Sequence, residues 1–387
     1  MSDISRLQKT FTEIYGCEAT AGYFSPGRIN LIGEHTDYNG GFVFPCAISF
    51  GNYCLIRKNE DGKIRLKSLN MTFEAELDLS ELNQKVDQEW VNYVIGVFAQ
   101  FLKKGICFNH GIDMLFYGDV PAGAGLSSSA AIEVVTAVAL NDTYQTGFDA
   151  PSLALMSQKA EHEFAGVQCG IMDQFASAMA KKDHAVFLNC DSLAFEQVPL
   201  RLEGYKILIS NTNSPHKLDS GLYNQRVWEC RNALQILKQS VDISNLAQLC
   251  NNEFESLQHT ITDPVIRRRA KHVVTETERT KKAVNYLREE NLRAFGELMK
   301  ASHLSLKHDY EVTGYELDTM FEEALKIEGV LGSRMTGGGF GGCTVSIVAS
   351  DAVDEFIENV GSGYFQKTRL KPSFYVAETS DGGKRIF

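Results

Sequence analysis

A polar run between glycines, residues 27–41, constrains this chain more than any other segment. Alternating apolar residues at its start predict a strand, and the pattern breaks at Gly33. A turn follows, and it carries Glu34, His35 and Asp37. A core segment would not hold this many charged side chains, because each buried charge needs a partner. Short carboxylates and an imidazole fixed between glycines suit the hydroxyls of a polyhydroxylated ligand, so the run predicts a sugar-binding turn.

The length predicts two domains, because 387 residues exceed one ordinary core. The pattern changes character between residues 188 and 205, and we place the boundary near residue 200, which gives domains 1–200 and 201–387. Strands and helices mix without a regular βαβ rhythm, which favours an α+β fold. The short connection predicts that the domains pack around a cleft.

Periodicity predicts the positions of the main elements. Helices are expected at residues 1–16, 90–104, directly after the loop 118–129, and at 152–164, 174–181, 222–238, 264–288, 291–302 and 316–327. Strands are expected at residues 42–48, 53–57, 64–68, 73–77, 111–117, 185–188, 205–210, 330–336, 343–348 and 373–378.

Charge and cysteine usage exclude several classes of protein. The net charge of −11 argues against a basic field for nucleic acid, and the basic patch 267–272 is interpreted as a solvated helix face. Nine widely spaced cysteines without a Cys-x-x-Cys pair predict reduced thiols and no zinc site. The N-terminus has no apolar run, and no segment approaches the ~20 apolar residues that cross a bilayer. We therefore expect a cytoplasmic chain that does not engage membranes.

A glycine-rich loop at residues 120–131 runs directly into a helix. Its small residues would let a polyanion approach the backbone, where N–H groups and the helix dipole favour negative charge. The alternative is a tight turn capped by Ser127. No Gly-Lys-Ser/Thr occurs, so the loop is not a Walker P-loop, and the protein-kinase signatures are absent as well.

Two acids further along the chain are candidates for chemistry. Glu161, together with a loop serine, would suit Mg²⁺, although a lone glutamate on a helix is usually solvated. Asp173 follows Gly170 and could accept a proton or hold a substrate hydroxyl, or it could be the N-cap of the helix at 174–181. The glycine-rich run 335–343 serves close backbone packing or close ligand approach, and it precedes a strand, unlike a dinucleotide fingerprint.

Taken together, the segments 27–41, 120–131 and 335–342 resemble the galactokinases of the GHMP small-molecule kinase superfamily. The Gly-Glu-His-Thr-Asp-Tyr-Asn run resembles the galactokinase signature, and Gly-Leu-Ser-Ser-Ser-Ala-Ala resembles the superfamily phosphate loop. The resemblance implies an N-terminal domain like ribosomal protein S5 domain 2, a C-terminal ferredoxin-like domain, and an active site between them. It also implies a phosphotransferase that converts ATP and α-D-galactose into galactose 1-phosphate and ADP, the first committed step of the Leloir pathway.

The same resemblance implies roles by matching position. The implied sugar-binding residues are Glu34, His35, Thr36, Asp37, Gly170 and Tyr223. The implied ATP-binding residues are Ser68, Gly123, Ala124, Gly125, Leu126, Ser127, Ser128 and Ser129. Ser129 and Glu161 would hold Mg²⁺, Asp173 would be the catalytic base, and Arg28 would stabilise the transition state.

Two alternatives stay open at this level. An N-acetylgalactosamine kinase shares the fold and the phosphate loop, and it differs in space at C2 of the sugar. A non-catalytic sugar sensor on the same scaffold would have lost residues after the loop serines, whereas Ser129, Glu161 and Asp173 are present here. The expected partners are galactose and MgATP, and the expected assembly is a monomer.

Overall fold

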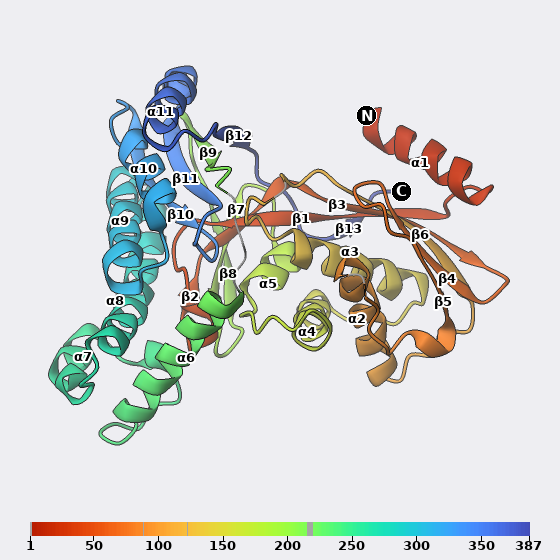
Figure 1. The fold of residues 1–387 in the computed structure, drawn as a ribbon, viewed down its shortest axis with the longest axis horizontal. Coiled ribbons are helices and arrows are strands. Elements are labelled where there is room, and N and C mark those ends of the chain that lie inside the picture. The colour runs from red at the N-terminus through yellow and green to blue at the C-terminus, as the bar shows by residue number, and fades with distance from the viewer. Residues whose placement is uncertain (1, 88, 122, 215–219) are drawn as a thin grey trace.

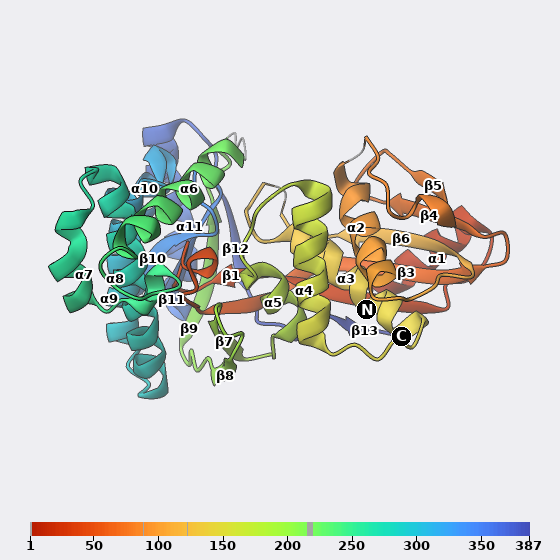
Figure 2. The same ribbon diagram turned by 90° about the horizontal axis from the view of Figure 1, so that it is seen from below.

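The computed structural model describes residues 2–87, 89–121, 123–214 and 220–387. Two sheets, each covered by helices, lie beside each other along the long axis of the molecule (Figure 1). The short helix α5 (Met172–Met179) lies at the junction of the two halves in both views (Figure 1, Figure 2). This arrangement confirms the predicted α+β class.

The first sheet has six strands in the order β13-β1-β3-β6-β4-β5. Its neighbours are antiparallel except for β4 and β6, which run parallel. The strands are β1 (Ala21–Asn30), β3 (Pro45–Asn59), β4 (Lys63–Ser68), β5 (Ala75–Asp78), β6 (Gly111–Gly118) and β13 (Lys384–Arg385). Helices α2 (Glu89–Lys103), α3 (Ser128–Thr143) and α4 (Ala150–Ala160) cover one face, and α1 (Ser2–Tyr15) covers the other (Figure 1).

Alternation along the strands explains why both faces of this sheet are covered. Cys54 and Ile56 of β3 belong to the core under α2, α3 and α4, whereas Leu55 between them packs with Leu7 and Phe11 of α1. Successive strand side chains point to opposite faces, so each covering layer buries its own set. The first sheet is therefore a three-layer unit.

The second sheet has four antiparallel strands in the order β10-β11-β9-β12. The strands are β9 (Tyr205–Asn211), β10 (Val330–Thr336), β11 (Cys343–Ala349) and β12 (Ser373–Ala377). Helices α8 (Pro264–Arg288), α9 (Leu292–Ser305), α10 (Gly314–Ala324) and α11 (Val353–Thr368) lie on the side away from the first sheet (Figure 1). Helices α6 (Ser220–Leu237) and α7 (Asn251–Leu257) complete this half.

A small third sheet, β2 (Phe42–Val43), β7 (His184–Asn189) and β8 (Phe195–Pro199), joins the halves. Short turns complete the chain: η1 (Asp37–Asn39), η2 (Leu79–Glu81), η4 (Leu246–Gln248), η5 (Gln258–Thr260) and η7 (Ser350–Ala352) are 3₁₀ helices, and η3 (Glu161–Ala165) and η6 (Leu306–Tyr310) are π-helices. The division into domains at residue 200 stays a prediction. The chain after β12 returns to the first sheet, where β13 pairs with β1.

Several local expectations differ from the structure. One long strand, β3, replaces the two expected at 42–48 and 53–57, and the helix expected at 152–164 ends at Ala160, where the π-helix η3 begins. Arg269 is 2% exposed and contacts Glu229 and Glu311, and His272 is fully buried, so the solvated interpretation of the basic patch was wrong for these two residues. Within the described ranges, no helix combines the length and apolar content needed to cross a membrane.

Candidate active site

The glycine-rich loop lies against β1 where the pairing of β1 with β3 is irregular. The register between β1 and β3 shifts between Pro26 and Arg28. A Cβ on Gly27 would lie 2.4 Å from the carbonyl oxygen of Leu126, and the Arg28 amide donates to that same oxygen at 3.2 Å. Only a glycine permits this approach. The close approach at Gly27 and the backbone bond of Arg28 therefore place Arg28 at the junction of strand and loop.

Arg28 and Asp173 form a two-pronged ion pair at this junction. Nε and Nη2 of Arg28 donate to Oδ1 and Oδ2 of Asp173, each at 2.8 Å, and Nη1 donates to the carbonyl of Gly125 at 2.9 Å. The Ser127 hydroxyl donates to Oδ2 of Asp173 at 2.6 Å. Bidentate guanidinium–carboxylate pairs fix orientation as well as charge. Strand β1, the loop and α5 thus meet at one carboxylate.

These contacts settle two alternatives from the sequence. Asp173 lies in the first turn of α5, whose N-cap is Ile171 and shows no side-chain capping bond, so the N-cap interpretation was wrong. Ser127 stands at the N-cap of α3 with φ 60°, but its side chain makes no capping bond there. The interpretation of the loop as a turn capped by the Ser127 side chain was therefore wrong as well, because that hydroxyl donates to Asp173 instead.

The turn after β1 presents Asp37 beside Gly170. A Cβ on Gly170 would lie 1.9 Å from Oδ2 of Asp37, so only a glycine leaves room for this carboxylate. Burial raises the pKa of Asp37 to about 7, and the negative charge of Asp173 adds to the effect. Asp37 and Asp173 therefore influence each other across one site. Hydroxyl groups that donate hydrogen bonds to such a carboxylate would stabilise its ionised form, because they replace the water it lost on burial.

His35 and Glu34 are buried and already carry structural contacts. His35 has φ 61°, its Nδ1 lies 2.8 Å from the hydroxyl of Tyr38, and its Nε2 lies 3.2 Å from the carbonyl of Gly338. Burial lowers the pKa of His35 to about 3, so the imidazole is neutral at pH 7. Glu34 accepts from the Gly337 amide at 2.8 Å and pairs with Nη1 of Arg334 at 2.7 Å.

The other residues that the resemblance implied for the sugar lie around this turn. Tyr223 of α6 has its ring centroid 5.7 Å from that of His35 and 5.5 Å from that of Tyr38. Thr36 is buried, and its hydroxyl lies 2.9 Å from the carbonyl of Gly33 and 2.8 Å from that of Phe42. Thr36 therefore holds the shape of the turn, and its sugar contact stays a prediction.

The loop that follows β6 has the backbone expected of an anion site. Gly123 and Gly125 have positive φ values of 65° and 68°, and a Cβ added at either residue would have no other atom within 4 Å. Ala130 lies in the first turn of α3. Helix α3 begins at Ser128, so its N-terminal amides border the loop. Ser68 ends β4, paired with Phe116 of the strand that leads to this loop.

The second glycine-rich run closes over the loop from the other half. A Cβ on Gly337 would lie 3.1 Å from the carbonyl oxygen of Gly125, and one on Gly342 would lie 3.5 Å from that of Ala124. A Cβ on Gly339 would come within 2.3 Å of the carbonyl oxygen of Val312. Close backbone packing, one of the two expected uses of these glycines, is therefore present, and close approach of a ligand stays a prediction.

Glu161 and Ser129 meet at the start of the π-helix η3. The Ser129 hydroxyl hydrogen-bonds the Glu161 carboxylate, and burial raises the pKa of Glu161 to about 6, with the charge of Asp173 adding to it. At 6% exposure Glu161 is not the solvated helix residue of the alternative interpretation. A hydroxyl and a buried carboxylate are ligands that Mg²⁺ accepts beside phosphate and water oxygens. The donor set fits Mg²⁺.

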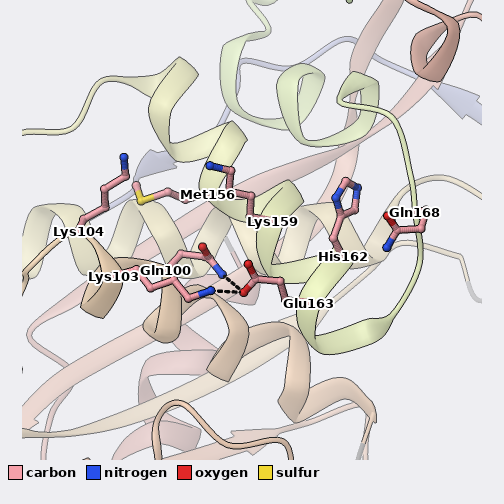
Figure 3. Close-up of a pocket in the computed structure, with 8 residues that line it drawn as sticks. All are labelled: Gln100, Lys103, Lys104, Met156, Lys159, His162, Glu163 and Gln168. Carbon is pink, nitrogen blue, oxygen red and sulfur yellow. Dashed lines mark hydrogen bonds and ion pairs between the residues drawn. The ribbon is translucent and has the colours of Figure 1, made fainter.

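The outer side of η3 is anchored to α2 beside a surface cavity of about 560 Å³ (Figure 3). Gln100 donates to Glu163 at 2.8 Å, and Lys103 pairs with the same carboxylate. His162 lies 2.8 Å through Nε2 from the carbonyl of Cys169. These contacts fix the turn that carries Glu161, and the cavity itself lies outside the Arg28–Asp173 junction.

Sequence reasoning missed several residues of the site, most of them buried. Arg334 and Tyr310 come from the second half, Tyr38 from the turn itself, and Glu133 and Gln174 from the helices behind Glu161. Tyr38 stood inside the polar run and was available as a signal. The others lie 100 to 300 residues from the turn in sequence, and no local pattern pairs them with it.

Two family descriptions match one segment in each half of the chain. Residues 92–181 match the GHMP kinases N terminal domain, and residues 283–366 match the GHMP kinases C terminal domain. The Methanococcus jannaschii mevalonate kinase structure shares the fold, with a TM-score of 0.65 at 18% identity over 93% of this chain and 98% of that chain. Together with a glycine-rich loop at a helix N-terminus, these matches and the fold define a GHMP kinase.

Residues 9–58 match the galactokinase galactose-binding signature, and the chain is 48% identical to the galactokinase of Clostridium acetobutylicum over 100% of both chains. The chain belongs to the galactokinase family. The Bacillus subtilis galactokinase is 45% identical over 98% of both chains. The crystal structure of Lactococcus lactis galactokinase complexed with galactose gives a TM-score of 0.97 at 43% identity, covering 99% of this chain and 100% of that one.

Proposed function

We propose that this chain transfers the γ-phosphoryl group of ATP to the C1 hydroxyl of galactose at the Arg28–Asp173 junction. The observation that carries the proposal is that two elements share the Asp173 carboxylate. Arg28, from the strand that leads into the sugar turn, and Ser127, from the glycine-rich loop, both donate hydrogen bonds to it. A group that touches both elements is where a sugar hydroxyl and a phosphate would meet. Phosphoryl transfer depends mostly on such positioning and on charge stabilisation.

The turn would recognise the sugar through acceptors on short side chains. Asp37 has few protein donors beyond nearby backbone amides, and its raised pKa reflects a carboxylate that hydroxyl donors would stabilise. Oε1 of Glu34 keeps a lone pair beyond the bond it accepts from the Gly337 amide. Both ring nitrogens of His35 are already used, by the Tyr38 hydroxyl and the Gly338 carbonyl, so His35 would act on the sugar by fixing the shape of the turn. Gly170 leaves the space in front of Asp37 open, and the Tyr223 ring packs beside the imidazole.

The chemical step would begin with the C1 hydroxyl near Asp173. As the oxygen bonds to the γ-phosphorus, its proton passes to the Asp173 carboxylate, and the bond to the β-phosphate oxygen breaks so that ADP leaves. A carboxylate held by a guanidinium is a weak base, and a loose transition state, in which the proton leaves late, requires no more. Arg28 would stabilise the charge that develops on the transferred group.

The loop amides of Gly123–Ser129 and the N-terminus of α3 would bind the phosphates of ATP. Ser129 and Glu161 would hold Mg²⁺, which supplies charge neutralisation for the phosphate oxygens when it is bound. Ser68 would contact the nucleotide from the end of β4. We also propose a monomer in the cytoplasm, which is consistent with nine free cysteines.

A coupled ADP-release assay with galactose, N-acetylgalactosamine, glucose and mevalonate tests the substrate. We expect turnover with galactose above the other three, and turnover dependent on added Mg²⁺. Galactose binding without turnover of any sugar would support a sensor and overturn the proposal. Faster turnover of N-acetylgalactosamine than of galactose would overturn the substrate. The role of Asp173 is tested separately with the Asp173→Asn variant. Asp191→Asn, at an exposed position, is the matched control for that variant.

A further inference from the structure

A buried polar cluster lies directly behind the Glu161 carboxylate. Glu133 of α3 and Gln174 of α5 are both fully buried, and Cys169 lies in the segment between η3 and α5. Gln174 follows Asp173 in the chain, so one turn of α5 presents consecutive residues to two parts of the site. Buried polar side chains are costly unless their hydrogen bonds are made. The pattern of those bonds shows what the cluster does.

The amide nitrogen of Gln174 joins two carboxylates. Nε2 donates to Oε2 of Glu161 at 2.5 Å and to Oε2 of Glu133 at 3.0 Å. A primary amide nitrogen has two hydrogens, so both are used, and a flipped amide would set its oxygen against two carboxylates. The Cys169 thiol donates to the same Oε2 of Glu161 at 3.4 Å. Both donors therefore act on the same oxygen of Glu161, Oε2, and hold that edge of the carboxylate from behind.

The cluster is not explained by packing alone. Oε1 of Gln174 and Oε1 of Glu133 are buried and lack a hydrogen-bond partner among the described residues. An apolar side chain of similar volume would fill the space without this cost. Burial raises the pKa of Glu133 well above its usual range, so its carboxyl adds little negative charge beside Glu161. The orientation of the Gln174 amide is the property that only this residue supplies.

We propose that Gln174, anchored by Glu133, is a positioning residue that fixes the Glu161 carboxylate for the divalent cation of the nucleotide complex. The inference rests on the proposed metal pair of Ser129 and Glu161. Residues that orient a metal ligand typically change metal affinity about ten- to a hundred-fold when they are replaced. Among the described residues, the Gln174 side chain hydrogen-bonds Glu133, Glu161 and Cys169, none of which belongs to the sugar turn, so its loss should leave sugar affinity in place.

The test uses Gln174→Met, which keeps the length of the side chain and removes both donors. Binding of Mn²⁺ to the enzyme–ADP complex is titrated by electron paramagnetic resonance, and galactose binding is measured by calorimetry without metal or nucleotide. Gln197→Met is the matched control, because the Gln197 amide also donates to an internal acceptor, the Met179 carbonyl at 2.6 Å, in the small third sheet. Gln174→Asn, which keeps the amide but shortens its reach, replaces Gln174→Met if that variant shows no cooperative unfolding.

We expect Mn²⁺ affinity about ten- to a hundred-fold weaker in Gln174→Met, with galactose affinity and the control unchanged. Equal losses of Mn²⁺ and galactose affinity would show a general structural role and overturn the inference, as would unchanged Mn²⁺ affinity in a folded variant. The Glu161→Gln variant distinguishes failure of the proposed metal pair from failure of the positioning role of Gln174. If Glu161→Gln leaves Mn²⁺ affinity unchanged, the proposed metal pair fails; if it weakens Mn²⁺ and Gln174→Met does not, only the positioning role fails.

Discussion

Replacing Gly170 by alanine tests how the sugar turn and α5 fit together. The new Cβ would lie 1.9 Å from Oδ2, 2.2 Å from Cγ and 2.7 Å from Cβ of Asp37. Ordinary carbon contacts lie near 3.5 Å, so the carboxylate would have to move by about 1.5 Å. Asp37 has a short side chain, so it can only rotate out of its present position. The substitution thus displaces a proposed sugar ligand without removing it.

The expected cost follows from the cost of overpacking a buried site. Overpacking typically costs about 1–3 kcal/mol, which corresponds to about 5- to 150-fold weaker galactose binding if the whole cost is relieved by moving Asp37. Calorimetric titration of galactose gives the affinity, and thermal unfolding shows whether the fold is retained. Gly361→Ala in α11 is the control, because its Cβ would meet only the Phe374 ring, at 3.3 Å. Galactose affinity equal to that of the native chain in folded Gly170→Ala would refute the placement of Asp37 at the sugar.

The remaining predictions concern the acid groups and the buried ion pair. Asp173→Asn should lower kcat by about 10²- to 10⁴-fold while calorimetry shows galactose binding retained, and near-normal turnover would sink the base assignment. Burial, reinforced by Asp173, raises the pKa of Asp37 from 3.8 to about 7, so its ionised form costs stability above that range. The thermal stability of Asp37→Asn relative to the native chain should therefore rise between pH 3.8 and about 7, and a pH-independent difference would contradict this. Arg334→Met should lose about 3–5 kcal/mol in urea unfolding, because it leaves the Glu34 carboxylate buried without its partner, and a loss under 1 kcal/mol would argue that Glu34 is protonated there.

Local patterns were enough to predict the elements that make the site. Alternation located β4, β6, β9, β10 and β11 closely, and the glycine-rich loop before α3 was visible as a loop that runs into a helix. The polar run 27–41 indicated a sugar turn, because its residue types have few other uses. The family and the fold were confirmed by the comparisons, whereas the roles of individual site residues stay predictions.

What local patterns could not predict depends on partners far along the chain. Helix α11 was not expected because Gly361 and Gly363 interrupt its helical propensity, and tertiary packing of Phe356 and Val360 overrides this. The π-helix after Ala160 keeps helical spacing, so nothing in its sequence marks the change. Burial of Arg269 requires Glu229 from α6, which no charge pattern within α8 reveals.

The pairing of Arg334 with Glu34 has a consequence for how the sugar enters and leaves. Arg334 belongs to β10 of the second sheet, Glu34 to the turn after β1, and Arg334 also donates to the Asn30 carbonyl at 3.0 Å. Swinging the two halves apart would strand these buried charges at about 3–5 kcal/mol, so the parted state would hold about one molecule in a few hundred to a few thousand. Amide hydrogen exchange along β10 should then be as slow as global unfolding allows. Substrate should enter and leave through smaller local openings, while the Arg334–Glu34 pair stays intact.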